Sequence, residues 1–463
     1  MTQATAKPTA SAFSLDPSDP LNDLRMSEKS RPLYEHVKRF IVETVNPMAV
    51  KYDKLSEGRS GAERWEYAPG QLDLLNGAKN QAKKEGLWNF FLPDADTGEG
   101  LSNLDYAYIA AELGKSPMAS ECMNCSAPDT GNMEVLARYG TPAQQAQWLT
   151  PLLNGDIRSA YVMTEPQVAS SDATNVSLRI DEDGDDYLLN GRKWWISGIM
   201  DERCTLLLVM GRHLPNGPRH AQHSTVIVPR GTPGLTIVRN QKVFGRLNSP
   251  GGEAELRFEN VRVPKANIIL GAGQGFEIAQ GRLGPGRIHH CMRSVGQAQR
   301  ALETMARRVD NRTAFGRKLS EQSSIRQDVA RSYCEIEQAR LLTLKAADTM
   351  DKHGNKVARD LIAAIKVVAP LMAQTVIDRA IQAHGGMGVS DDTELAYFWS
   401  INRYVRIADG PDEVHMNQLG RQKIKEYAGL PAKGSSPADP SGVEPAHPAG
   451  SASASVAKPT RAA

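Results

Sequence analysis

In this 463-residue chain, the stretch 407–415 holds the residues best suited to chemistry and reads Ile-Ala-Asp-Gly-Pro-Asp-Glu-Val-His. Asp409 stands just before a predicted helix start, because Pro411 suits the first helical position, where no N–H is missed. Asp412 and Glu413 then suit the positive end of the helix dipole. A carboxylate held at a helix end beside a ligand is a candidate general base, although an aspartate in such a turn more often caps the helix. This stretch alone leaves both interpretations open.

A glycine-rich turn upstream could hold the ligand. Residues 382–388 read Gln-Ala-His-Gly-Gly-Met-Gly and follow a predicted helix. Gly385 and Gly386 would let the backbone approach a flat ligand closely. A helix C-cap is compatible with the same residues.

The composition is that of an ordinary globular protein and argues against several functional classes. The formal net charge of +2 disfavours a nucleic-acid surface. No apolar run approaches the length needed to cross a bilayer, and the N-terminus lacks a secretory or mitochondrial pattern, so a cytoplasmic location is expected. Cys122 and Cys125 form a lone C-x-x-C and are expected to be small buried thiols rather than a metal site. No metal is predicted elsewhere, since His213, His220 and His223 are interpreted as solvated.

Three regions of different periodicity must position the candidate residues. Helical stripes fill residues 25–158, short apolar segments separated by turns fill residues 159–270, and helices return in residues 271–429. The segments 1–24 and 430–463 are rich in Ala, Ser and Pro and are predicted to be disordered. The middle region is expected to be an antiparallel β domain.

The order helical, β, helical predicts an α+β fold. In the last region a break is expected at Gly354, and the helix 357–383 is apolar on most sides, which predicts a buried place in a bundle. No G-x-G-x-x-G opens a helix after a strand, and no Walker A motif occurs, so a Rossmann or P-loop enzyme is disfavoured.

Several stretches, taken in order, resemble the acyl-CoA dehydrogenase family. They are Tyr-Val-Met-Thr-Glu-Pro at 161–166 with Ser171 and Asp172, Asn-Gly-Arg-Lys-Trp-Trp-Ile-Ser-Gly at 190–198, Arg-Thr-Ala-Phe-Gly-Arg at 312–317, Gln382 with the glycines after it, and Asp409-Gly410. The resemblance covers about residues 30–428. The runs that begin at Ser170 and Ala408 look most like the subgroup that contains human family members 10 and 11.

The resemblance implies an acyl-CoA dehydrogenase-like fold with an N-terminal helical domain, a middle β domain and a C-terminal four-helix bundle. It also implies FAD, bound between the β domain and the C-terminal helices. Thr164 would hydrogen-bond the pyrimidine edge of the flavin, with Met163 as a further cofactor residue, and Trp195 would pack against the ring. Ser197 would lie near N5, where a reduced flavin gains electron density. Ser171 would lie close to the FAD pyrophosphate and the CoA pantetheine.

A second set of residues matches those that hold the adenine and pyrophosphate of FAD across a subunit boundary in this family. The set is Arg312, Phe315, Gln382, Gly385 and Gly386. Arginine suits bidentate phosphate contact. The resemblance therefore implies a homodimer or homotetramer.

Asp409 occupies one of the two places at which the family carries its catalytic carboxylate. At the other, just before Arg287, stands Gly286, which cannot act as a base. Asp409 is one methylene shorter than the usual Glu, so either the backbone or the substrate must sit about 1.5 Å closer. Desolvation by substrate would raise the pKa of Asp409, and Arg287 could oppose that shift or orient the carboxylate. The resemblance makes Ser171, Arg287, Asp409 and Gly410 the substrate contacts, with the backbone N–H of Asp409 polarising the thioester oxygen.

The implied activity is FAD-dependent α,β-dehydrogenation of an acyl-CoA to trans-2-enoyl-CoA in fatty-acid β-oxidation, with electrons passed to electron-transfer flavoprotein. His289 and His290 follow Arg287 and could line the acyl pocket. One alternative is an oxidase of the same fold, acting on nitroalkanes or acyl-CoAs, because nitroalkane oxidases also use an aspartate base. Another is a flavoprotein that has lost its activity and serves as a binding module.

Overall fold

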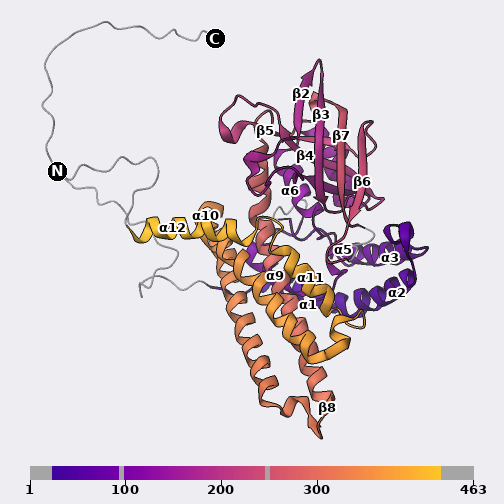
Figure 1. Ribbon diagram of the computed structural model, residues 1–463, viewed down its shortest axis with the longest axis vertical. Coiled ribbons are helices and arrows are strands. Elements are labelled where there is room, and N and C mark those ends of the chain that lie inside the picture. The colour runs from indigo at the N-terminus through magenta and orange to yellow at the C-terminus, as the bar shows by residue number, and fades with distance from the viewer. Residues whose placement is uncertain (1–22, 93–97, 246–250, 429–463) are drawn as a thin grey trace, which may run out of the picture. The chain divides into compact units, whose positions relative to one another are not determined.

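The computed structural model describes residues 23–92, 98–245 and 251–428 (Figure 1). The predicted disordered segments 1–24 and 430–463 lie almost entirely outside the described residues. The chain up to Leu419 forms one compact unit, and the residues from Gly420 belong to a second.

The first region of the chain is helical. Two of its helices begin with a side-chain cap: Ser102 accepts from the N–H of Asp105, and Thr141 and Gln144 form a capping box. The helices are α1 (Arg31–Phe40), α2 (Asn46–Ser56), α3 (Gln71–Lys84), α4 (Asn103–Gly114), α5 (Ala119–Cys122), α6 (Asp129–Tyr139), α7 (Pro142–Gln144) and α8 (Thr150–Asn154).

The middle region forms one seven-stranded sheet, in which β2, β3, β7 and β6 lie side by side (Figure 1). The strands are β1 (Arg158–Val162), β2 (Arg179–Asp183), β3 (Asp186–Ile196), β4 (Cys204–Arg212), β5 (His223–Pro229), β6 (Leu235–Gln241) and β7 (Glu253–Pro264). Four of the recorded pairings are antiparallel, but β4 pairs in parallel with β1 and with β2. The predicted β domain is confirmed, and its description as wholly antiparallel is corrected to a mixed sheet, because β1 reaches β4 through a crossover rather than a hairpin.

The last region consists of long helices joined by a small hairpin. Its elements are α9 (Gly275–Asn311), β8 (Thr313–Ala314), β9 (Arg317–Lys318), α10 (Ser323–His384), α11 (Leu395–Val405) and α12 (Asp412–Tyr427). The predicted break is confirmed, because Gly354 has φ 77° and ψ 172° within α10. The second half of α10 buries Leu361, Ile365 and Val376, as expected for a helix in the middle of a bundle.

One helix in the described chain, Ser323–Val389, is long and apolar enough to cross a membrane by length and composition. The prediction that no apolar run reaches this length is therefore wrong. The most apolar window of this helix is 61% buried inside the fold, which is how the core helix of a bundle passes the same test.

A large apolar core joins the first and last helical regions, and the sheet has a second core of its own. Helix α4 packs directly on α9: a Cβ atom at Gly296 would lie 1.9 Å from the carbonyl oxygen of Ala111. Only glycine permits this close approach. The packing places one face of α9 between α4, α6 and α10, and this face carries the candidate site.

Candidate active site

Asp409 lies in the turn between α11 and α12, where the backbone is unusual. Asp409 has φ 56° and Gly410 has φ 99°, both in the left-handed region that side chains disfavour. A Cβ atom at Gly410 would lie 2.8 Å from Nε2 of His415, so this position requires glycine. Helix α12 begins at Asp412, within one residue of the predicted start.

Side chains of three helices hold the backbone of this turn. Arg287 donates to the carbonyl of Asp409 from Nε at 3.4 Å and Nη2 at 3.3 Å, and Nε2 of His415 donates to the same oxygen at 3.2 Å. Buried Lys366 donates to the last carbonyl of α11 at 2.5 Å and to the carbonyl of Gly410 at 3.3 Å. Within the described chain, no backbone acceptor is recorded for the N–H of Asp409, which leaves that N–H available to a ligand.

The carboxylate of Asp409 faces His290 on α9. Oδ2 of Asp409 lies 3.3 Å from Nε2 of His290, and the two side chains are 25% and 26% exposed, so a ligand can reach both. The N–H of Asp412, which an N-cap at Asp409 would bind, donates instead to the carbonyl of Arg406 at 3.2 Å. The capping interpretation of Asp409 is therefore wrong, and its side chain is available for chemistry.

The surroundings of the pair keep Asp409 ionised. Burial raises the pKa of Asp409, but its neighbours lower it more, so that the pKa lies below the ordinary 3.8. These neighbours are His290, Arg282, Lys366 and Arg287. Burial and the charge of Arg293 lower the pKa of His290 to about 4, although Asp409 opposes this. At neutral pH an ionised carboxylate therefore faces an uncharged imidazole. Arg287 takes one of its two expected roles, because its charge opposes the effect of burial on Asp409.

Gly286 on α9 occupies the other place at which the family carries its catalytic carboxylate. A larger side chain would fit there, but glycine supplies no carboxylate. A Cβ atom there would meet nothing within 4 Å. Asp409 is thus the carboxylate that the chain offers at either position.

The segment predicted to meet the flavin edge follows β1 and rests on a buried ion pair. Nζ of Lys193 donates to the carbonyl of Met163 at 2.7 Å and to Glu165 at 2.9 Å, and the Lys193 and Glu165 side chains are 0% and 1% exposed. Burial lowers the pKa of Lys193 to about 8, although Glu165 opposes this. The N–H of Trp194 donates to the carbonyl of Thr164 at 3.0 Å. The peptide groups of Met163 and Thr164 are therefore held in one orientation.

Trp195 lies in a β-bulge. The register of β3 against β7 shifts between Lys193 and Ile196, and Trp195 has φ 54°. Its N–H donates to buried Gln241 at 2.6 Å, which satisfies the group that the bulge removes from the ladder. The Trp195 residue remains 36% exposed and packs on one side against Trp194, with ring centres 6.2 Å apart. The bulge therefore presents an aromatic face for stacking.

Ser197 connects the end of β3 with α11. Its Oγ lies 3.2 Å from the phenolic oxygen of Tyr404. Burial raises the pKa of Tyr404 above its ordinary range, so the phenol stays protonated. Tyr404 lies in the last turn of α11, and its carbonyl accepts the N–H groups of Ile407 and Ala408. Tyr404 thus connects Ser197, the predicted N5 contact, with the turn that holds Asp409, the predicted base. We refer to this meeting point of β3 and α11 as the junction.

Ser171 is exposed in the loop after β1. On one side, the N–H of Glu165 donates to Oγ of Ser170 at 2.9 Å. On the other, Asp172 accepts from the N–H of Thr174 at 3.0 Å. These two turns leave the Ser171 side chain facing outward, where a ligand can reach it.

The residues predicted to hold adenine and pyrophosphate are all exposed. Arg312 and Phe315 lie beside the β8–β9 hairpin, and Phe315 is 101% exposed with φ 52°. Gln382, Gly385 and Gly386 are exposed at the end of α10.

These residues share one end of the C-terminal helices. Arg379, one turn before Gln382, pairs with Glu335 near the start of α10 at 2.6 Å. That start follows the end of α9 through the β8–β9 hairpin. From Arg287 to its end at Asn311, α9 spans about 36 Å at 1.5 Å per residue. The set therefore lies far along the bundle from Asp409, whose carbonyl Arg287 contacts.

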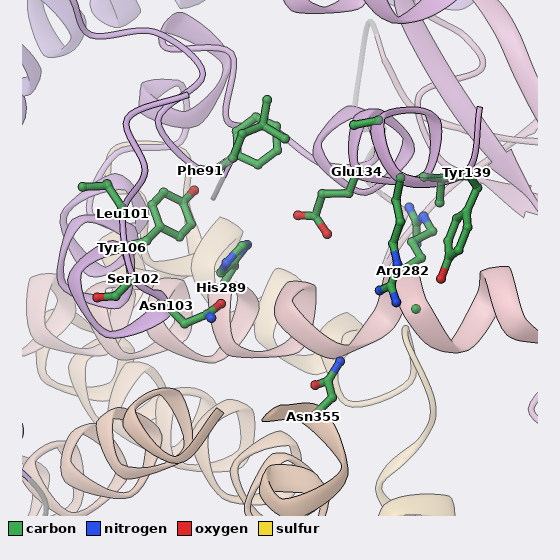
Figure 2. A pocket seen from close by; sticks show the side chains of 15 residues that line it. Phe91, Leu101, Ser102, Asn103, Tyr106, Glu134, Tyr139, Arg282, His289 and Asn355 are labelled. Atoms are coloured by element: carbon green, nitrogen blue, oxygen red, sulfur yellow. The ribbon is translucent and has the colours of Figure 1, made fainter. Parts of the chain in front are cut away.

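A cavity of about 320 Å³ opens between α4, α6 and α9 (Figure 2). Figure 2 shows Glu134 pointing into it from α6, with Arg282 of α9 on the same side of the view. Tyr106 and His289 form another wall, with ring centres 4.4 Å apart in an edge-to-face arrangement. Burial raises the pKa of Glu134 to about 7, although Arg282 opposes this. The Arg282 guanidinium, which also influences Asp409, lies 4.3 Å from the ring centre of Tyr161, so it links the cavity to the base.

Several residues of the site have no counterpart in the sequence analysis. They are Arg282, Lys366, Tyr404 and Glu134, together with the contact of His290 to Asp409. Lys366 is the one charged residue in the apolar run 361–373, and this was a usable signal for it. The other residues come from unrelated helices, and no spacing in the sequence relates them.

Two minor expectations are corrected. His213 and His223 are buried, not solvated, and bond Ser224 and the carbonyl of Val176. His220 is exposed, as predicted. Cys122 and Cys125 are buried free thiols, as predicted.

Three sequence models of one family match the chain in the order of its regions. They are Acyl-CoA dehydrogenase, N-terminal domain, over residues 27–156, the middle domain over residues 160–261, and the C-terminal domain over residues 273–424.

Curated proteins of similar sequence carry the same family name. Mouse acyl-CoA dehydrogenase family member 10 is 53% identical over 408 residues, covering 87% of this chain and 38% of that protein. Human acyl-CoA dehydrogenase family member 11 is 46% identical over 405 residues, covering 87% and 51%. The probable acyl-CoA dehydrogenase FadE2 of Mycobacterium tuberculosis is 52% identical over 403 residues, covering 87% and 97%. The chain thus spans about half or less of the two mammalian proteins and nearly all of the bacterial one.

Solved structures share the fold. One described provisionally as an acyl-CoA dehydrogenase from Mycobacterium abscessus has a TM-score of 0.83 and 47% identity, covering 87% of this chain and 100% of that chain. Butyryl-CoA dehydrogenase from Megasphaera elsdenii has a TM-score of 0.71 and 24% identity, covering 86% and 99%.

Proposed function

Because the chain belongs to the acyl-CoA dehydrogenase family, in the neighbourhood of family members 10 and 11, we propose that it catalyses α,β-dehydrogenation of an acyl-CoA thioester. The product is the trans-2-enoyl-CoA. The observation that carries this proposal is the ionised, partly exposed carboxylate of Asp409, held at the junction that Ser197 and Tyr404 form.

The residues of this junction fit FAD, the cofactor of the family. The bulge presents the ring of Trp195, Lys193 fixes the peptides of Met163 and Thr164, and the Ser197 hydroxyl faces the same junction. A flat aromatic face, fixed peptide groups and a hydroxyl donor are the groups that an isoalloxazine needs. When bound there, FAD supplies the acceptor for the hydride that leaves the β carbon.

The chain's own part in the reaction is to take the α-proton and to hold the thioester. Asp409 is ionised at neutral pH and therefore able to accept a proton without first losing one. Arg287 and His415 hold the carbonyl of Asp409. In the part of the chain that the structure describes, the N–H of Asp409 has no backbone acceptor, so it can donate to the thioester oxygen. Such a donor stabilises the negative charge that develops on that oxygen as the α-proton leaves.

We assign the acyl chain to the cavity between α4, α6 and α9. His289 lines this cavity and its neighbour His290 faces Asp409, which supports a continuous path from base to cavity. Of the two histidines expected to line the acyl pocket, we therefore assign His289 to the acyl chain and His290 to the contact with Asp409.

The remaining assignments stay proposals. We propose electron-transfer flavoprotein as the electron acceptor, a role in fatty-acid β-oxidation and a cytoplasmic location. We also propose a homodimer or homotetramer, supported by the exposed set around Arg312, Phe315 and Gln382 at the far end of the helices.

The test is an anaerobic titration of the purified holoprotein with acyl-CoAs of several chain lengths. The flavin absorbance near the visible maximum should bleach with one or more of them. Asp409→Asn should keep its flavin, because its backbone contacts are unchanged, and should lose reduction by at least about a thousandfold. The proposal is wrong if no acyl-CoA bleaches the flavin while nitroalkanes do, and the base lies elsewhere if Asp409→Asn is reduced at the wild-type rate.

A further inference from the structure

The contacts of His290 define which of its nitrogens carries the proton. Nδ1 of His290 lies 3.3 Å from Nη2 of Arg293. A guanidinium can only donate a hydrogen bond, so Nδ1 is the acceptor. The single proton of the neutral ring is therefore on Nε2, which lies 3.3 Å from Oδ2 of Asp409. The geometry makes His290 a donor to the carboxylate.

Arg293 is itself held from the opposite side. Its Nη1 donates to the carbonyl of Cys125 at 3.4 Å, on the segment between α5 and α6. A connected row of donors thus runs from the N-terminal helical region through Arg293 and His290 to Asp409. Such a row fixes both the tautomer and the orientation of the imidazole, as second-layer contacts do at other sites.

We propose that His290 is a positioning residue for the general base, which as a neutral Nε2–H donor holds the carboxylate of Asp409 in one orientation and stabilises its ionised form. This rests on the proposed function, because it presumes that Asp409 removes the α-proton. A neutral donor suits this role better than a cation. It favours the ionised carboxylate, yet after proton transfer no buried ion pair has been broken.

Other groups face this pair and contribute to the same field. They are Arg282, Arg287, His289, Cys291 and Arg293 on α9, Lys366 on α10, Tyr404 on α11 and His415 on α12. A test must therefore change the Nε2–H donor alone and leave these charges in place. Two substitutions of similar size do this: His290→Gln keeps a neutral N–H donor, and His290→Met removes it.

The test follows α-proton exchange instead of dehydrogenation. A 3-thiaacyl-CoA has sulfur at the β position, so it cannot lose a β hydride, and exchange of its α-protons into D₂O reports the base directly. NMR of the holoprotein from pH 3 to 8 gives the exchange rate at each pH, because the pKa of Asp409 lies below 3.8 before a ligand binds. Since a hydrogen bond to an ionised group is equivalent to a shift on the order of one pH unit, the acid limb of His290→Met should move up by about one unit. Its plateau should fall on the order of tenfold as the carboxylate loses its fixed orientation.

His290→Gln should keep the acid limb within about a third of a unit of wild type, because its donor persists. The proposal is overturned if the Met and Gln variants shift equally, or if the Met variant keeps the wild-type profile. A variant that merely loosened the fold would lower the plateau without moving the limb, and that result also counts against the proposal.

A second measurement needs no substitution in the observed protein. In ¹⁵N-histidine-labelled wild-type protein, the signal that is missing from His290→Gln belongs to His290. We expect Nδ1 of this ring to be unprotonated, Nε2 to be protonated, and neither to titrate between pH 5.5 and 8. A proton on Nδ1, or titration near pH 6.5, overturns the assignment. Failure of the proposed function is distinct from all these outcomes, because wild-type protein would then catalyse no exchange at any pH.

Discussion

Glu134 offers a quantitative check on the cavity between α4, α6 and α9. Its carboxyl group points into the cavity (Figure 2), and burial raises its pKa from 4.5 to about 7. Between these pH values the folded protein holds a proton that an unfolded glutamate has released. The free energy of unfolding therefore falls as the pH rises through this window and levels off above pH 7. At about 1.36 kcal/mol per unit of pKa, the loss between pH 5 and 8 is about 3 kcal/mol.

Glu134→Gln removes this pH dependence because glutamine stays neutral. Unfolding entropies of about 2.1 cal/mol/K per residue give about 1 kcal/mol/K for a chain of this size, so 3 kcal/mol corresponds to about 3 °C in Tm. The Tm of the variant relative to wild type should therefore rise by about 3 °C between pH 5 and pH 8. Differential scanning calorimetry of the holoproteins at both pH values measures it, with Glu202→Gln on the exposed surface as the control.

The raised pKa of Glu134 also predicts how the affinity of the cavity for an unsubstituted acyl chain depends on pH. An alkyl chain beside Glu134 favours the protonated carboxyl, so the Kd of such an acyl-CoA should rise above pH 7, by up to about tenfold per unit. Isothermal titration into the Asp409→Asn protein, which cannot turn the ligand over, measures this rise, and adding Glu134→Gln should abolish it. A Tm difference that is the same at pH 5 and pH 8 would refute the assignment of a raised pKa to Glu134. A pH-independent Kd with a confirmed pKa would instead place the acyl chain outside this cavity.

Further predictions concern the supports of the site. Lys193→Met should lower the free energy of unfolding by about 3 kcal/mol, because Glu165 is left buried without its cation; urea unfolding and the retained flavin content measure this. Gly410→Ala should keep the fold but lower flavin reduction at least about tenfold, since its Cβ would lie 2.8 Å from His415; stopped-flow reduction with an intact circular dichroism spectrum is the expected result. Tyr404→Phe should keep the Tm within about 1 °C and shift the flavin absorption maximum, because Ser197 loses its phenolic partner; an unchanged spectrum would separate this pair from the flavin.

The sequence predicted those parts of the fold that depend on local patterns. The break at Gly354 and the order of helical and β regions follow from periodicity and turn residues. The mixed sheet was not predictable in the same way, because the pairing of β1 with β4 joins strands that are distant in the chain. Short apolar strands of either pairing type look alike in the sequence.

In the candidate site, too, the residues that stand in local motifs were predicted, and the contacts between distant segments were not. Asp409, Trp195 and Ser197 were found because each stands in a compact motif. His290 was named as an acyl-pocket residue, and its contact with Asp409 depends on how α9 faces the turn after α11. Such contacts between separate helices leave no spacing in the sequence for a periodicity argument to detect.

The contact of His290 also gives a physical reason for the shorter acid. Oδ2 of Asp409 already lies 3.3 Å from Nε2 of His290. A glutamate at the same backbone position would carry its carboxylate about 1.5 Å further out, where the imidazole stands. Because Arg287 and His415 fix the carbonyl at 409, the backbone cannot withdraw to make room. His290 therefore occupies the space that the longer side chain of a glutamate at 409 would need. The same residue limits the length of the base and orients its carboxylate.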